Sequence, residues 1–134
     1  MQDNSATLAT LHQLRTLGVK IAMDDFGTGY SSLSYLQSFP FDKIKIDRSF
    51  VKDIAENTNS LNIVRAVAAL AKGMGMTATA EGVETRDQLD RVTSEGCTEM
   101  QGFLFSRPLP AREIEQWLLF GGDVPQARDR FAAA

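Results

Sequence analysis

The spacing of apolar positions switches repeatedly along the chain between that of a helix and that of a strand. Leucines three residues apart, from Leu8 to Leu17, predict a first helix that begins among the polar residues 3–5 and ends at Gly18. Thr85 and Gln88 form a capping-box pattern that opens a later helix. Four further helices are predicted over residues 30–39, 61–72, 85–96 and 111–120. Short apolar runs predict four strands over residues 19–24, 43–47, 76–81 and 99–105.

Alternation of strands and helices predicts an α/β fold with parallel strands joined by right-handed crossovers. In such folds the ligand site lies at the C-terminal ends of the strands. Polar residues stand at these ends: Asp24, then Lys45 with Asp47 on one strand face, and then Glu81. Gln101, early in the fourth strand, can face the same way. This layout indicates an active site at the mouth of an α/β barrel.

The amino-acid composition excludes several classes of function. The 134 residues are 43% hydrophobic and 23% charged, as in one soluble globular domain. A net charge of −3 provides no basic surface, so we expect no nucleic-acid polymer as a partner. The single cysteine, Cys97, fits a reducing compartment, and the single histidine, His12, lacks partners for a histidine metal site. With no membrane-length apolar run and no signal-peptide pattern, we expect a cytoplasmic segment without membrane contact.

Two adjacent carboxylates, Asp24 and Asp25, end the first predicted strand. One of them is explained by a turn or a helix cap, whereas two are better explained by metal ions or a substrate cation. On the dipeptide alone, these two interpretations remain equally open. The following Gly27-Thr28-Gly29 lacks the third glycine of a nucleotide-binding loop, since Ser32 stands there. These glycines therefore predict a sharp turn.

The other polar strand residues each have an ordinary explanation too. Lys45, like Lys43, is explained as a solvated strand residue, although a buried lysine beside carboxylates can hold a water or a phosphate oxygen. Glu81 is explained as a strand end before a helix cap, and Gln101 as a satisfied core amide. The position of Glu81 at the end of its strand favours it as a site residue.

Taken together, four segments resemble the EAL-domain family of cyclic di-GMP phosphodiesterases. These segments are DDFGTGYSSL at 24–33, IKIDRSFV at 44–51, AEGVET at 80–85 and QGFLFSRP at 101–108. They occur in the family's order and spacing, and the resemblance covers residues 5–120. It implies a TIM-like barrel with one reversed strand and hydrolysis of the cyclic dinucleotide to its linear form in bacterial second-messenger signalling.

The resemblance also implies roles for particular residues. Two divalent metals, Mg²⁺ or Mn²⁺, serve the family's reaction, with Asp24 as a ligand of one and Asp25 belonging to the other. Lys45 orients the attacking water, and Glu81 binds metal or its water. Asp47 and Gln101 line the site, and the metal-binding loop includes Phe26, Gly27, Thr28 and Gly29. Phe103 stands where the family often has Tyr.

The resemblance extends only to the C-terminal half of the family's domain. The sequence contains no Glu-Ala-Leu motif and lacks the Asn and Glu metal ligands that the family carries on earlier strands. We therefore expect residues 1–122 to be a partial EAL domain with incomplete metal sites, followed by a flexible tail at 123–134. Its expected partners are cyclic di-GMP in the complete domain, and the missing N-terminal half or a second copy in a dimer.

Two other functions remain as alternatives at this point. One is a non-catalytic binding or oligomerisation module derived from an EAL domain. The other is an unrelated metal-dependent barrel enzyme, which the four motifs disfavour.

Overall fold

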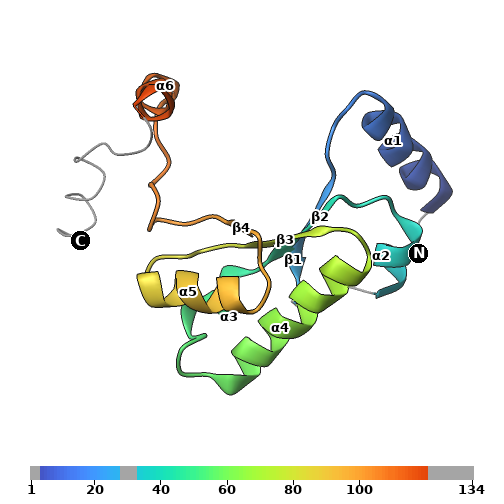
Figure 1. Cartoon of the computed structure of the whole chain (residues 1–134). Helices are drawn as coiled ribbons and strands as arrows, with labels where there is room; N and C mark the ends of the chain where they lie inside the picture. The colour runs from blue at the N-terminus through green and yellow to red at the C-terminus, as the bar shows by residue number, and fades with distance from the viewer. Residues whose placement is uncertain (1–3, 28–32, 121–134) are drawn as a thin grey trace.

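The computed structural model describes residues 4–27 and 33–120 of the chain (Figure 1). Helices and strands alternate along it, as the sequence pattern predicts. The elements in order are α1 (Asn4–Thr16), β1 (Ala22–Phe26), α2 (Leu33–Ser38), β2 (Lys43–Ile46), α3 (Arg48–Lys52), α4 (Thr58–Gly73), β3 (Thr77–Ala80), α5 (Arg86–Ser94), β4 (Glu99–Met100) and α6 (Ala111–Leu119). None of the described helices combines the length and hydropathy needed to cross a bilayer.

The four strands form one parallel sheet in the order β1-β2-β3-β4. This arrangement confirms the predicted parallel α/β fold. Side chains of a strand alternate between the two sheet faces, and the register aligns Ile44 with Ala78 and Ile46 with Ala80. These four side chains are buried, and both isoleucines are 0% exposed. Helices α3, α4 and α5 lie on this apolar side of the sheet (Figure 1).

Three helices end in the same way just before a strand. In each, a glycine with positive φ follows the helix and the next residue donates its N–H back to the last turn, as in a Schellman motif. The glycines are Gly18, Gly75 and Gly96, and the backward bonds run from Val19 to Leu14, from Met76 to Ala71 and from Cys97 to Val92. This ending reverses the chain into the sheet, and it confirms Gly18 and Gly96 as the predicted helix stops.

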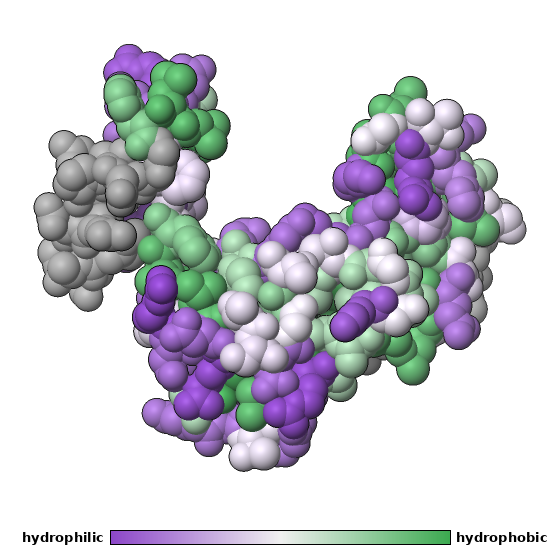
Figure 2. Space-filling view, viewed as in Figure 1, coloured by the Kyte–Doolittle hydropathy of each residue, from purple (hydrophilic) through white to green (hydrophobic). Residues whose placement is uncertain are grey.

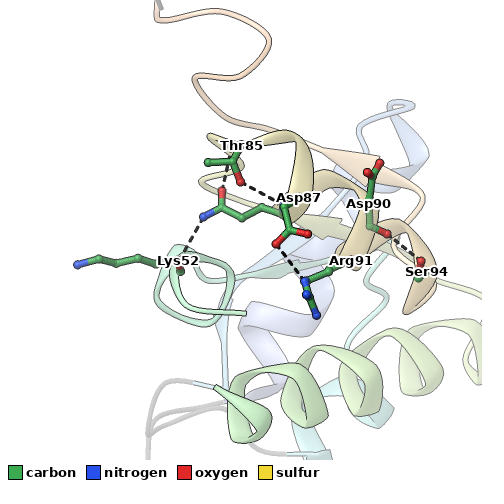
Figure 3. Close-up of polar contacts among 7 residues, drawn as sticks. Lys52, Thr85, Asp87, Asp90, Arg91 and Ser94 are labelled. Atoms are coloured by element: carbon green, nitrogen blue, oxygen red, sulfur yellow. Dashed lines mark hydrogen bonds and ion pairs between the residues drawn. The ribbon is translucent and has the colours of Figure 1, made fainter. Parts of the chain in front are cut away.

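The predicted capping box of α5 is also confirmed. The Gln88 N–H donates to Thr85 Oγ1 at 3.1 Å, and Gln88 Oε1 accepts from the Thr85 N–H at 3.1 Å. The Gln88 amide also donates to the carbonyl oxygen of Lys52 at the end of α3 (Figure 3). One side chain therefore both begins α5 and ties it to α3.

Element ends shift by up to three residues, as in β1, which spans Ala22–Phe26 and not residues 19–24. Two elements differ more. Helix α3 is additional, and it forms because Asp47 accepts a hydrogen bond from the Ser49 N–H at 2.9 Å and so caps it. Strand β4 ends at Met100, not at residue 105. The backbone still pairs at Gln101, which donates to Ala80, but the chain then turns because Gly102 lies directly against the Val83 backbone. Asp3, the start of the second predicted helix at 30–32, and the expected tail at 123–134 lie outside the described residues.

The opposite face of the sheet is open between α1 and α6, which rise on either side of it (Figure 1). Strands β1 and β4 are the two edges of the sheet, so neither has a second neighbour among the described residues. Helix α6 and the residue after it expose Ile114, Leu118, Leu119 and Phe120, and apolar colour gathers on this helix in Figure 2. The described part is thus a sheet covered by helices on one face.

The close approach of Gly102 to Val83 yields a stability prediction. A Cβ at position 102 would lie 2.0 Å from the Val83 carbonyl oxygen, so Gly102→Ala must displace backbone. We expect this variant to lower the free energy of unfolding by about 2 kcal/mol or more, measured by urea titration. Gly73→Ala is the matched control, because nothing lies within 4 Å of its Cβ position at the end of α4. This control should be neutral or slightly stabilising, and equal effects at the two positions would contradict the prediction.

Candidate functional site

A β-bulge in β1 brings the two adjacent aspartates to the same end of the sheet. Met23 pairs with Ile44 and Phe26 pairs with Ile46, so Asp24 and Asp25 together stand opposite a single residue of β2. Asp25 has a φ of 52°, in the left-handed region that Asp tolerates better than most residues. Its N–H donates to Asp24 Oδ1 at 2.9 Å. The bulge thereby interrupts the alternation that would send neighbouring carboxylates to opposite faces.

Glu81 completes a cluster of carboxylates. One ligand atom from each of Asp24, Asp25 and Glu81 lies within 4.8 Å of the others. Glu81 follows β3, and its N–H donates to the carbonyl oxygen of Ile46 at 3.1 Å, which extends the sheet by one residue. The three side chains therefore meet because the ends of two parallel strands, β1 and β3, flank β2.

Lys45, between these two strands, places a positive charge beside the cluster. Its Nζ lies 2.6 Å from Glu81 Oε1, and the two side chains are 24% and 18% exposed. The hydrogen bond with Glu81, and after it the charges of Glu81, Asp24 and Asp25, raise the pKa of Lys45 above its usual value. Lys45 is therefore a charged hydrogen-bond donor and not a base at neutral pH.

The aspartates differ in their electrostatics. The neighbouring charge of Asp24 is the main reason why the pKa of Asp25 is raised, and a side-chain hydrogen bond with Asp47 adds to it. The pKa of Asp47 is lowered, chiefly by its hydrogen bonds with Ser49. Asp47 thus has two contacts, as the cap of α3 and as a neighbour of Asp25, which agrees with its predicted place beside the site.

The cluster suits a hard divalent cation. Such ions prefer carboxylate oxygens, and a cation would offset the repulsion that raises the pKa of Asp25. Asp24, Asp25 and Glu81 are the residues that would hold divalent cations here. These are the three residues predicted from the sequence to bind metal, and the structure brings them together.

The predicted loop residues and Gln101 lie outside the carboxylate cluster or outside the described residues. Phe26 is buried in the core, and Gly27 has a φ of 99° and lies against the Phe50 ring. Thr28 and Gly29 lie outside the described residues. Gln101 is exposed and lines a groove of about 570 Å³ between the turn after β4 and α6. Its role in lining the carboxylate site stays a prediction.

Sequence reasoning missed a second polar group on the same sheet face. Lys43 forms an ion pair with Glu99, and Thr79 Oγ1 donates to the same Glu99 oxygen at 3.1 Å. The signal in the sequence was the two-residue spacing of Lys43 and Lys45, which puts both lysines on one face of β2. Glu99 carries no such signal, because its partner is 56 residues away.

Comparison with known proteins identifies the family. Residues 1–108 match the family model described as the EAL domain. The chain belongs to the EAL-domain family. It is 46% identical over 114 residues to the bifunctional diguanylate cyclase/cyclic di-GMP phosphodiesterase MucR of Pseudomonas aeruginosa, a match that covers 85% of this chain and 17% of MucR.

Solved EAL structures share the fold. The EAL domain of Mycobacterium smegmatis DcpA is 49% identical with a TM-score of 0.85, over 93% of this chain and 56% of that one. A manganese/cyclic di-GMP complex of Klebsiella pneumoniae BlrP1 is 43% identical with a TM-score of 0.73, over 80% of this chain and 27% of that one. The chain therefore matches the EAL domains of cyclic di-GMP phosphodiesterases over part of their length.

The repulsion at Asp25 predicts a pH-dependent stability effect in this EAL chain without metal. The pKa of Asp25 is raised in the folded chain. Stability therefore falls as the pH rises from the usual value of 3.8 to this raised pKa, and below 3.8 the carboxyl carries no such cost. Asp25→Asn should therefore raise the urea midpoint in EDTA at neutral pH, and the gain should vanish on acidification below that value.

The measurement on Asp25→Asn has a matched control variant and a second part with added metal. Asp90→Asn, at an exposed position of α5, should show no such gain. Adding Mn²⁺ should raise the midpoint of the unsubstituted chain more than that of Asp25→Asn, because the variant has lost one ligand. A gain that persisted unchanged at acid pH would assign the effect to something other than the charge of Asp25.

Proposed function

We propose that this chain supplies the metal-binding and water-orienting side of a cyclic di-GMP phosphodiesterase site. The observation that carries the proposal is the cluster of Asp24, Asp25 and Glu81 with Lys45 held against Glu81. Relatives named as cyclic di-GMP phosphodiesterases, MucR and Pseudomonas aeruginosa NbdA, are 46% and 45% identical to it. The proposed reaction is hydrolysis of one phosphodiester of the cyclic dinucleotide to the linear product.

In this proposal the carboxylates hold divalent cations, Mg²⁺ or Mn²⁺. Asp24 would serve one ion and Asp25 the second, and Glu81 would bind metal or its water. When bound, such ions supply hydroxide at neutral pH and stabilise the charge on the phosphate oxygens. The Klebsiella pneumoniae relative whose structure is a manganese/cyclic di-GMP complex supports this choice of ion and substrate.

Lys45 is proposed to orient the attacking water. A lysine whose pKa is raised donates hydrogen bonds and does not take up protons, so its part is positioning and charge stabilisation. Its hydrogen bond to Glu81 fixes the ammonium at the edge of the carboxylate cluster. Asp47, beside Asp25, and Gln101, directly after β4, are proposed to line the substrate side.

We also propose that this site is incomplete in the chain alone. A divalent cation such as Mg²⁺ or Ca²⁺ takes six or more oxygen ligands, so two ions need more than three carboxylates even with several waters. The chain spans 56% of the DcpA EAL structure and 46% of a structure of the MucR phosphodiesterase in complex with cyclic di-GMP. Residues 1–122 would then be one part of the catalytic domain, joined by the rest of the barrel.

The roles are tested in a complete EAL domain that carries this chain. Asp24→Asn, Lys45→Ala and Glu81→Gln should each lower kcat by about a hundredfold or more, because a group that acts in the transition state contributes several kcal/mol there. Lys72→Ala, at an exposed position in the last turn of α4, is the matched control and should keep normal turnover. Near-normal hydrolysis of cyclic di-GMP by Lys45→Ala would show that its assigned role is wrong.

The chain alone should neither turn over cyclic di-GMP nor remain a monomer. Within the described residues, β1 and β4 each pair with a strand on one side only, and α6 exposes an apolar face. Pairing with a second copy, or with the missing half, covers both. Sedimentation at micromolar concentration should show a dimer or larger species. A folded, monodisperse species near 14.7 kDa would contradict this expectation.

The exposed apolar face of α6 also favours a second candidate function, a non-catalytic module that assembles through this surface. The two candidates separate when the remaining half of an EAL barrel is supplied in trans. Recovery of cyclic di-GMP hydrolysis that Asp24→Asn abolishes supports the enzyme. Stable assembly without hydrolysis supports the module.

A further inference from the structure

Two lysines and two glutamates share the open face of the sheet and form two separate ion pairs. Lys45 pairs with Glu81 in the candidate site, and Lys43 pairs with Glu99 outside it. Both lysines come from β2, two residues apart, so their side chains leave the same face. Nothing in the proposed function uses the second pair.

The register of the strands makes this choice of partners unexpected. Lys45 aligns with Thr79, and Thr79 aligns with Glu99, so Lys45 and Glu99 stand at one level across three strands. Lys43 aligns with Thr77, one level further from the site. At about 4.8 Å per strand, Lys45 and Glu99 start from backbones about 10 Å apart, which a lysine and a glutamate side chain together can span. Glu99 is therefore a competitor of Glu81 for Lys45.

Two contacts remove this competition. Lys43, aligned with Thr77, forms an ion pair with Glu99 and so offsets its negative charge. Thr79, which is 4% exposed, lies between the competing residues in the register and donates to Glu99 Oε2, the same oxygen that Lys43 contacts. Because Lys43 offsets the charge of Glu99, and Thr79 and Lys43 both hold Oε2, Glu99 attracts Lys45 less than Glu81 does.

We propose that Lys43 is a positioning residue, which holds Glu99 through an ion pair and so reserves Lys45 for Glu81. The effect on the site is electrostatic and geometric. When Lys45 turns to Glu99, its positive charge leaves the cluster of Asp24, Asp25 and Glu81, and the donor proposed to orient water is lost. Divalent cations then bind more tightly while catalysis falls. The inference rests on the proposed function in its statements about metal affinity and turnover, and not in its statement about the contacts of Lys45.

The first test uses the 134-residue chain without metal or substrate. In Lys43→Met, the NMR signals of the Lys45 side chain should move, and its nuclear Overhauser contacts should shift from residue 81 to residue 99. The double variant Lys43→Met/Glu99→Gln removes the competitor as well and should restore the Lys45 contacts. Lys43→Arg keeps the ion pair and should resemble the unsubstituted chain, and Lys72→Met controls for loss of a lysine charge elsewhere.

The second test measures Mn²⁺ affinity by calorimetry on the same variants. Moving one positive charge from about 4 to about 8 Å from a divalent ion should tighten binding about fivefold in Lys43→Met. The double variant should return to the original affinity. In a complete EAL domain, Lys43→Met should lower kcat about tenfold or more, and the double variant should recover it. A loss of stability would not raise Mn²⁺ affinity while lowering kcat, so this combination separates the two explanations.

Three results would overturn the inference. One is an unchanged Lys45 environment in Lys43→Met, and another is a change that Glu99→Gln fails to reverse, since a structural role predicts no rescue. If Lys43→Met does not fold, Lys43→Gln is measured in its place. The third result is then an unchanged set of Lys45 contacts in Lys43→Gln, which would also refute the inference. A chain that binds no Mn²⁺ would contradict the proposed metal site, while the metal-free Lys45 contacts would still decide this inference.

Discussion

Repulsion among Asp24, Asp25 and Glu81 is the constraint on which the site end of this structure depends. Three carboxylates within 4.8 Å of one another disfavour the folded state unless cations offset them. Lys45 offsets part of this charge through Glu81, and the raised pKa of Asp25 shows that part remains. The bulge in β1 maintains the repulsion, because it keeps both aspartates at the same end of the sheet. Folding alone gives no reason for such an arrangement, whereas binding of a divalent cation does.

Packing on the apolar face of the sheet offsets the repulsion among the carboxylates. Ile44 and Ile46 are fully buried against the helices, and they alternate along β2 with Lys43 and Lys45. A slip of one residue in register would bury both lysines and expose both isoleucines. Hydrophobic burial on one side therefore fixes the register that places the charged residues on the other. The positions of the site residues follow from packing of residues that take no part in the site.

The sequence predicted what depends on local spacing and missed what depends on pairing between strands. Helix ends at Gly18 and Gly96 and the Thr85–Gln88 capping box were predictable, since each is encoded within a few residues. The bulge was not, because it exists only relative to the register of β2. Helix α3 was missed because Asp47 was interpreted as a strand residue of the site, whereas its side chain also caps that helix. The early end of β4 arises from contact between Gly102 and Val83, which no spacing within β4 indicates.

Lys45 and a divalent cation make opposing demands on Glu81. A carboxylate has two oxygens, so Glu81 can accept from Lys45 with one and serve a cation with the other. The ammonium nevertheless repels the cation, and its presence lowers affinity for metal. A site selected only for tight metal binding would not place a lysine there. The arrangement is understandable if affinity is given up for a fixed hydrogen-bond donor beside the bound ion, since catalysis gains from groups positioned before the reaction begins. The proposed role of Lys43 fits the same logic, because its ion pair with Glu99 offsets the charge of a second carboxylate within reach of Lys45.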